Sequence, residues 1–174
     1  PLTMATLSKN PILVDFFDPE NGAWNSHVAL GEWADCYLIA PATANTLAKM
    51  ACGIADTTVT LAAKAHLRNC RPILLAPSTN DGLAASARNL GQLMARKYIY
   101  LVPFRQDDPE EKPASLVADF SLVADAAQAA LEGRQLQPVL LGRCELFVEK
   151  SPLYYTRLES DRACCIAFSA YWRY

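Results

Sequence analysis

The sequence predicts a three-layer α/β/α domain built on a parallel sheet. Short apolar runs alternate along the chain with stretches of helical composition. The runs, of which Cys36 to Ala40 is typical, are short enough to be strands buried on both faces of a sheet. Three of them are followed by proline and then by a loop, and we expect the strands to end there.

The bulk composition limits the class of protein. The chain has 174 residues, of which 52% are hydrophobic and 20% charged, which suits one globular domain. A net charge of -2 gives no electrostatic basis for binding nucleic acid or an acidic membrane. No apolar run approaches the roughly 20 residues that span a bilayer. The six cysteines form no CxxC pair or zinc spacing, so we expect a reduced, cytoplasmic protein.

The amino-terminal segment contains three predicted elements. They are a short helix over Pro1 to Ser8, a strand over Ile12 to Phe17 and a helix over His27 to Trp33, which Ser26 could cap. The chain opens at Pro1 without an initiator methionine and enters a helical pattern at once. We therefore expect that it begins inside a domain and lacks the first strand of its sheet.

The stretch from Cys36 to Asp56 organises the rest of the chain. A predicted strand, Cys36 to Ala40, ends at Pro41 and is followed by hydroxyl and amide residues and a helix closed by Gly53. The start of a helix at the carboxyl end of a strand suits an anion, because its first backbone N–H groups are free and the helix dipole is positive there. A capped helix after a core strand explains the same residues equally well.

The next segment repeats this arrangement. We expect a helix over Thr57 to Leu67, a strand over Ile73 to Ala76 ended by Pro77, and a polar loop over Ser78 to Gly82. A helix from Leu83 to Lys97 follows, with inward side chains from Leu90, Leu93 and Met94. The loops at Thr43 and Ser78 should lie at the same edge of the sheet, since parallel strands end on one side.

The last part of the chain contains a strand, a polar loop and a helix. The strand is Tyr98 to Val102, the loop is Phe104 to Pro113, and the helix is Ser115 to Glu132 with Gly133 as its C-cap. We expect residues 1–141 to form the domain. Residues 142–174 have no sustained period, and a peripheral hairpin, a disordered tail and a non-native reading frame are alternatives.

The central sequence IAPATANTLAK resembles the flavin-binding signature of the homo-oligomeric flavin-containing cysteine decarboxylase superfamily. The resemblance implies a flavodoxin-like fold and an FMN site formed by Thr43, Ala44, Asn45 and Thr46. It also implies a homo-oligomer acting on a small carboxylate substrate.

Two members of that superfamily match different parts of the chain. Residues 1–56, with SHVALGEWAD, resemble phosphopantothenoylcysteine decarboxylase, and this implies that His27 is a catalytic histidine in coenzyme A biosynthesis. Residues 57–141, with PSTNDGL and FRQDDPEEKP, resemble the B subunit of dipicolinate synthase. That resemblance implies oxidation of dihydrodipicolinate to dipicolinate during sporulation, together with an A subunit that binds NADP. The two matches indicate a composite chain, and a non-catalytic oligomerising subunit is a third alternative.

The loop after the second strand favours the dipicolinate interpretation. The decarboxylases carry PAMNxxMW there, and this chain retains Asn80 but has Thr79, Leu83 and Ala84 at the methionine and tryptophan positions. By resemblance, Asn80 is a catalytic residue alongside His27, and Ser78, Thr79 and Asn80 bind the substrate carboxylate. A surface histidine, and a loop in which Asp81 caps the next helix, are the structural alternatives.

Several other charged residues are candidates for ligand contacts. The arginines Arg68, Arg71 and Arg105 could pair with carboxylates or remain at the surface. The pair Asp107 and Asp108 could serve a metal or acid–base chemistry, but no histidine or further acid completes a metal set. A loop that contacts solvent or a partner is therefore favoured, and no metal is expected.

Overall fold

A computed structural model describes residues 27–142 and 164–167, together with residues 6 and 9. The helix predicted for Pro1 to Ser8 and the strand predicted for Ile12 to Phe17 fall mainly outside this part of the chain. The described elements, in order, are α2 (His27–Trp33), β1 (Cys36–Ala42), α3 (Ala44–Cys52), α4 (Thr58–Arg68), β2 (Ile73–Thr79), α5 (Ala87–Met94), β3 (Ile99–Leu101), β4 (Phe104–Asp108), β5 (Lys112–Ala118), the 3-10 helix η1 (Phe120–Leu122), α6 (Val123–Leu131) and β6 (Cys164–Ala167).

These elements form the predicted α/β/α arrangement around a six-stranded sheet. The strand order is β4-β5-β2-β1-β6, and β3 pairs with the first half of β2. Strands β1, β2, β3 and β6 are parallel, whereas β5 runs antiparallel to both β2 and β4. The sheet is therefore mixed rather than wholly parallel, and residues 164–167 contribute the strand beside β1.

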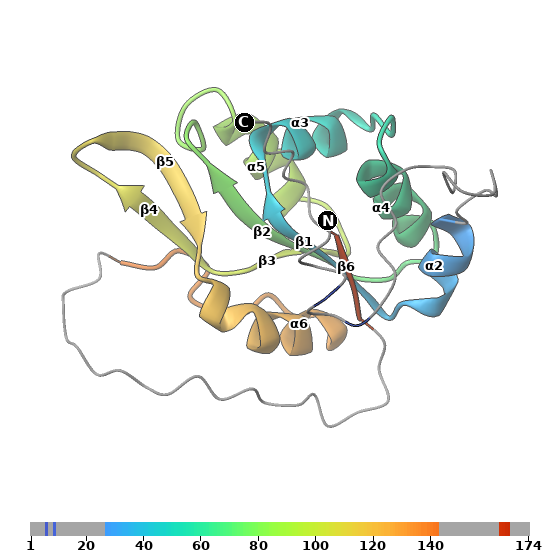
Figure 1. The fold of residues 1–174 in the computed structure, drawn as a ribbon. Coiled ribbons are helices and arrows are strands. Elements are labelled where there is room, and N and C mark those ends of the chain that lie inside the picture. The colour runs from blue at the N-terminus through green and yellow to red at the C-terminus, as the bar shows by residue number, and fades with distance from the viewer. Residues whose placement is uncertain (1–5, 7–8, 10–26, 143–163, 168–174) are drawn as a thin grey trace.

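Helices α3, α4 and α5 lie on one side of the sheet and α6 on the other (Figure 1), and an apolar layer holds each side to the sheet. Tyr37, Ile39 and Leu75 face a cluster that includes buried side chains of α3, α4 and α5. Leu38 and Leu74 face the other cluster, to which α6 contributes buried alanines. The alternation of neighbouring residues between two clusters is what a strand buried on both faces requires.

Both central strands continue through the prolines that were expected to end them. β1 includes Pro41 at an irregularity in its pairing with β2, between Ile39 and Ala42. β2 includes Pro77, which lies where its neighbour on one side changes from β3 to β5. The missing N–H of each proline therefore falls where the ladder is already interrupted.

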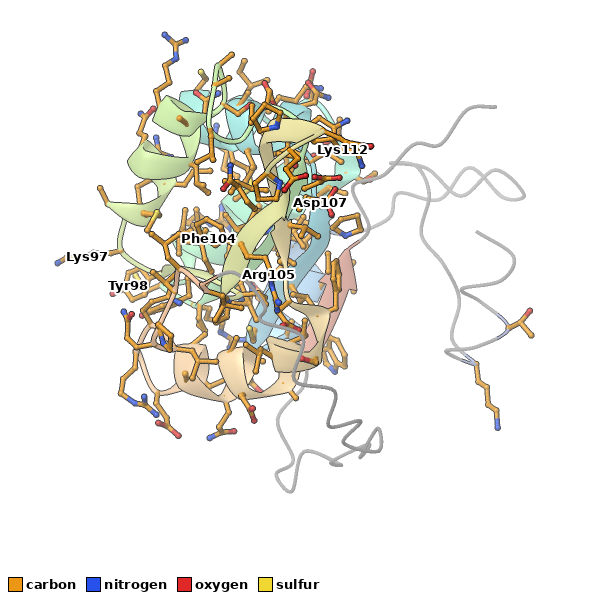
Figure 2. The ribbon with its side chains drawn as sticks, turned by 90° about the vertical axis from the view of Figure 1, so that its left-hand side faces the viewer. Lys97, Tyr98, Phe104, Arg105, Asp107 and Lys112 are labelled. Atoms are coloured by element: carbon orange, nitrogen blue, oxygen red, sulfur yellow. The ribbon has the colours of Figure 1, made fainter. Side chains whose placement is uncertain are left out.

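The segment predicted as a polar loop and the start of a long helix is a β-hairpin. Phe104–Asp108 pairs with Lys112–Ala118, and the final helix begins only after Asp119, whose side chain accepts the N–H of Ser121. Figure 2 shows Phe104 and Arg105 low on the hairpin, with Asp107 and Lys112 higher up, towards the turn that joins its strands. The prediction of a helix over Ser115 to Ala118 was wrong.

The helix after β2 is shorter than predicted. Residues 80–86 form turns, and α5 occupies only Ala87–Met94. Leu90 and Leu93 are buried as expected, but Met94 is 43% exposed, so its assignment to the core was wrong. Gly133 has the positive φ of 74° that favours glycine after a helix, as predicted.

Candidate functional site

Two polar segments meet at one edge of the sheet. β1 ends at Ala42 and β2 ends at Thr79, and Ala42 lies opposite Pro77 in the parallel pairing of the two strands. The turn at Thr43 and the residues from Ser78 onward therefore lie at the same edge of the sheet, as the sequence predicted. This edge carries the carboxyl ends of the parallel strands, where α/β proteins bind ligands.

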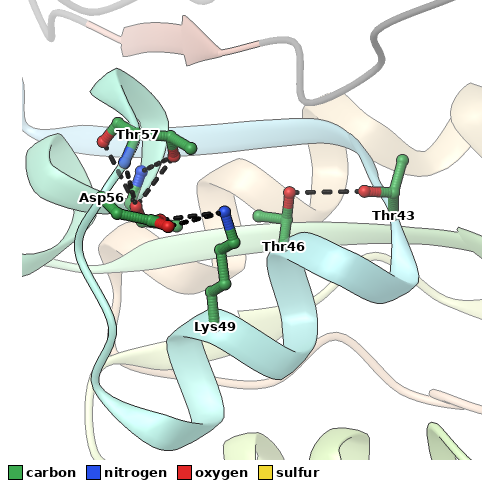
Figure 3. A network of polar contacts seen from close by, with 6 residues as sticks. Thr43, Thr46, Lys49, Asp56 and Thr57 are labelled. Carbon is green, nitrogen blue, oxygen red and sulfur yellow. Dashed lines mark hydrogen bonds and ion pairs between the residues drawn. The ribbon is translucent and has the colours of Figure 1, made fainter.

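The first turn of α3 leaves backbone donors available. Thr43 occupies the N-cap position, but its side chain makes no capping hydrogen bond to the helix. Its Oγ1 instead lies 3.3 Å from Oγ1 of Thr46 (Figure 3). Thr46 is buried, whereas Asn45 is exposed. The first N–H groups of a helix have no partner within the helix, so this end of α3 suits an anionic ligand.

The connection from α3 to α4 is fixed by an ion pair and a capping box (Figure 3). Lys49 Nζ lies 2.9 Å from Asp56 Oδ1, and this contact is the main reason that the pKa of Asp56 is lowered. Thr57 and Thr60 then exchange backbone and side-chain hydrogen bonds at the start of α4. Lys49 is engaged in the described structure, and it holds the end of α3 in place.

An open hollow of about 700 Å³ lies between α3, the turn after β2 and α5. This volume is within the usual range of ligand sites, about 300–1,000 Å³. Its wall combines small side chains with polar ones, which are Asn45, Asp81, Ser86, Arg88 and Asn89, and the small residues are Ala44, Ala48, Ala84 and Ala85. The sequence did not point to Ser86, Arg88 or Asn89, because nothing in their local pattern separates them from the surface of an ordinary helix.

The residues predicted to bind substrate occupy different environments. Ser78 and Thr79 are the last residues of β2 and are half-buried, whereas Asn80 is exposed in the turn that follows. Thr79 Oγ1 donates to Asp81 Oδ1 at 2.5 Å, so that hydroxyl is already engaged. Ser86 Oγ donates to the other carboxylate oxygen of Asp81 at 2.9 Å. The hydroxyl of Thr79 is the main cause of the lowered pKa of Asp81.

The two predicted catalytic residues lie on separate elements. His27 is the first residue of α2, and its side chain lies outside the part of the structure that is described. Asn80 is the first residue after β2. In the sheet, β2 and β6 lie on opposite sides of β1. The pairing of His27 with Asn80 in one active site therefore stays a prediction.

The remaining candidates have structural partners or are exposed. Arg71 Nη1 donates to the backbone carbonyls of Glu32 and Ala34, at 2.7 and 2.5 Å, and Arg105 pairs with Asp119. Arg68 is exposed. Asp107 pairs with Lys112 at 3.2 Å across the hairpin. Among the described residues, no group of three potential ligands could hold a metal ion.

Comparison with known proteins identifies the family. The family model described as "Flavoprotein" matches residues 1–131. The chain belongs to this flavoprotein family. The resemblance drawn from IAPATANTLAK is thereby confirmed at the level of the superfamily.

The relatives within the family include a decarboxylase and a B subunit of dipicolinate synthase. A cysteine/cysteine sulfinic acid decarboxylase from an unknown prokaryotic organism is 59% identical over 96 residues, covering 53% of this chain and 26% of that protein. The B subunit of dipicolinate synthase from Bacillus subtilis (strain 168) is 47% identical over 107 residues, covering 62% of this chain and 54% of that protein. The match thus spans about a quarter of the first relative and about half of the second.

Solved structures support the same fold. The structure of the dipicolinate synthase B subunit from Bacillus halodurans C has a TM-score of 0.68 at 37% identity, covering 81% of this chain and 69% of that one. The FMN-dependent cysteine decarboxylase SpaF has a TM-score of 0.58 at 30% identity, covering 76% and 71%. The flavodoxin-like fold is therefore confirmed. In the described residues, no helix is both long and apolar enough to cross a membrane.

Proposed function

We propose that this flavoprotein binds FMN and acts like the B subunit of dipicolinate synthase, oxidising dihydrodipicolinate to dipicolinate with an A subunit that binds NADP. The observation that carries the proposal is the segment from Ser78 to Ala84, in which Thr79, Leu83 and Ala84 stand where the decarboxylase motif has its methionines and tryptophan. Similarity to the dipicolinate synthase B subunit over 81% of the chain, at 37% identity, supports the choice. The substrate class is a small carboxylate.

The residues around the start of α3 fit the anionic part of FMN. The helix has no side-chain cap, and its first residues, Ala44 and Asn45, line the hollow. Free N–H groups and the positive end of the helix dipole would attract a phosphate. Thr43, Ala44, Asn45 and Thr46 would hold the group, with the Asn45 amide able to donate and accept hydrogen bonds.

Bound flavin would supply two-electron redox chemistry, while the chain's own residues bind and orient the substrate. The oxidation removes two hydrogens from the dihydropyridine ring, and NADP on the A subunit would take up the equivalent of one hydride, the second hydrogen leaving as a proton. Ser78 and Asn80 offer a hydroxyl and an amide to a carboxylate. Thr79 would contribute through Asp81, because its hydroxyl donates to that carboxylate.

A second candidate is FMN-dependent decarboxylation of phosphopantothenoylcysteine. It is favoured by the retained Asn80 and by 38% identity over 109 residues to the coenzyme A biosynthesis bifunctional protein CoaBC of Bacillus subtilis (strain 168). In this alternative His27 assists proton transfer and Asn80 holds the carboxylate. Release of CO2 from phosphopantothenoylcysteine by the FMN-loaded chain, without dipicolinate formation, would select it.

The proposed FMN site predicts a charge effect at Asn45. The substitution Asn45→Asp places a negative charge at the start of α3 and should weaken FMN binding about tenfold, which corresponds to about 1.4 kcal/mol. Fluorescence quenching of FMN on titration with the full-length chain measures this. Gln92→Glu, the same change at an exposed position of α5 that does not line the hollow, should leave binding unchanged.

The outcomes separate the candidate functions. No quenching by the wild-type chain would remove the flavin proposal and favour a non-catalytic oligomerising subunit. Quenching with no ultraviolet-absorbing dipicolinate when the A subunit, NADP and dihydrodipicolinate are added would remove the dipicolinate assignment. If Asn45→Asp and the wild type bind FMN with equal affinity, the FMN phosphate does not bind at the start of α3.

A further inference from the structure

The turn that follows β2 is built around the carboxylate of Asp81. Thr79 Oγ1 and Ser86 Oγ donate to its two oxygens at 2.5 and 2.9 Å, and the Asp81 N–H donates back to Thr79 Oγ1 at 3.3 Å. The Asp81 carbonyl accepts the N–H groups of Ala84 and Ser86. Asp81 therefore joins the end of β2 to the residue that precedes α5, across the whole turn.

The outer side of this turn is packed against the hairpin. The Leu83 N–H donates to the Ala114 carbonyl at 2.9 Å. Gly82 is buried, and a Cβ at this position would approach Leu116 Cγ and Cδ1 to 2.7 Å, which is too close. β5 thus fixes one side of the turn. Asp81 and its two hydroxyl donors hold the other side, which faces the hollow.

Asn80 lies within this assembly but outside its hydrogen bonds. It stands between Thr79 and Asp81, its side chain is exposed, and it is the first residue beyond β2. A carboxylate that accepts hydrogen bonds from two hydroxyl groups forms charge-assisted hydrogen bonds, which are stronger than hydrogen bonds between neutral groups. The lowered pKa of Asp81 agrees with an ionised group at neutral pH, so these bonds persist under ordinary conditions.

We propose that Asp81 is a positioning residue that fixes the turn 79–86 and so sets the direction in which Asn80 presents its amide to a carboxylate ligand. The proposal rests on the function proposed above, in which Asn80 contacts the substrate. Asp81 acts through its two hydroxyl contacts and makes no contact of its own with the ligand.

Two substitutions at Asp81 separate the hydrogen bonds from the charge. Asp81→Asn keeps one acceptor and gains a donor, and both hydroxyls can turn to satisfy it, so the turn should be retained. Asp81→Ala removes both contacts. Calorimetric titration of the FMN-loaded, full-length chain with dipicolinate should give an affinity within about threefold of wild type for Asp81→Asn. Asp81→Ala should bind at least about tenfold more weakly.

A double-mutant cycle tests whether Asp81 works through Asn80. If it does, Asn80→Ala combined with Asp81→Ala should bind dipicolinate no more weakly than Asn80→Ala alone. The far-ultraviolet circular dichroism spectrum of Asp81→Ala should match that of wild type, which distinguishes a local effect from loss of the fold. Ser86→Ala removes one of the two contacts and should fall between wild type and Asp81→Ala.

A matched control comes from the hairpin. Asp108 Oδ1 accepts the N–H groups of Glu110 and Glu111, so it also fixes a turn, but it does not line the hollow. Asp108→Ala should therefore leave dipicolinate binding unchanged.

Wild-type affinity in Asp81→Ala or additive losses in the Asn80 cycle would overturn the inference. A loss in Asp81→Asn as large as in Asp81→Ala would overturn it as well, because the role would then belong to the charge. Tighter binding of dipicolinate by Asp81→Asn would also overturn it, since the charge would then face the ligand directly. Failure of the wild-type chain to bind dipicolinate would instead count against the proposed function itself.

Discussion

A single buried histidine links α4 to the start of β2. His66 is 1% exposed, its Nε2 lies 3.1 Å from the Pro72 carbonyl oxygen, and its ring centroid is 5.9 Å from that of Tyr37. Burial is the main cause of its lowered pKa, and the nearby Arg71 charge acts in the same direction. The Pro72 and Gly31 carbonyls and the Asp35 carboxylate oppose this shift. His66 is therefore a neutral structural residue.

This histidine predicts a pH dependence of stability. Because its pKa is lowered in the folded state, the unfolded chain binds more protons once the pH falls below about 6.5. The free energy of unfolding should therefore decrease as the pH falls from about 6.5 towards the pKa of His66 in the folded state. Urea denaturation at several pH values measures the slope, and His66→Gln should flatten it. Comparing His27→Gln with the double variant His27→Gln/His66→Gln removes any contribution of the other histidine. Equal slopes of unfolding free energy against pH in these two variants would contradict the prediction.

At the residue scale, local signals could be predicted and tertiary ones could not. Gly53 closes α3 with a positive φ of 74°, as its sequence position indicated. The link from Asp81 to Ser86 was missed because it depends on a turn, rather than on the helix predicted from Leu83. Arg71 was considered a partner for carboxylates, but it donates to the backbone of α2.

At the scale of elements, two arginines each donate hydrogen bonds to the carboxyl end of a helix from another part of the chain. Arg71 donates to the carbonyls of Glu32, in the last turn of α2, and of Ala34, just after it, and Arg96 donates to the Met50 and Ala51 carbonyls at the end of α3. The last carbonyls of a helix lack partners within it, and a cation is favourable there. Arg96 reaches its two carbonyls with two nitrogens of the guanidinium fork, whereas Arg71 donates to both of its carbonyls from Nη1.

Loss of either arginine should therefore destabilise the fold. Arg71→Ala and Arg96→Ala should each lower the free energy of unfolding by about 1–3 kcal/mol, since hydrogen bonds to charged groups are lost. Lysine at position 96 should recover less than half of this, because a single ammonium nitrogen cannot reproduce the contacts of two separate guanidinium nitrogens. Arg68→Ala, at an exposed position, is the control and should change stability by less than about 0.5 kcal/mol. Equal effects at Arg68 and Arg71 in urea denaturation would contradict the role of the hydrogen bonds to the helix carbonyls.

The errors at this scale have identifiable causes. Proline at 41 and 77 indicated strand ends, but each falls where the ladder is interrupted, which only the neighbouring strands determine. Residues Leu116, Phe120 and Val123 have helical spacing, yet Leu116 belongs to β5, where it and Ala118 are buried and Val117 is half-buried. Asp119, the cap of η1, was the sequence signal that the helix begins later.

At the scale of the whole molecule, the sheet separates two cores that share the same strands. Leu74 belongs to the cluster on the α6 face and Leu75 to the cluster facing α3, α4 and α5, and both are fully buried. The α/β/α layers could be predicted because this pattern repeats in the apolar runs of the sequence. The antiparallel β5 could not, because its pairing with Ser78 and Thr79 is a long-range contact.

Because the two cores share β1 and β2, damage to either should destabilise the described domain as a unit. Leu74→Ala and Leu75→Ala should each lower the free energy of unfolding by about 2–5 kcal/mol, because each leaves a cavity in a packed layer. Urea denaturation followed by circular dichroism should show a single transition with an earlier midpoint and an unchanged m-value. The matched control Leu83→Ala, at a side chain 53% exposed, should have a much smaller effect. A second transition in only one of the core variants would show that the layers unfold independently, and the shared sheet would then not couple them.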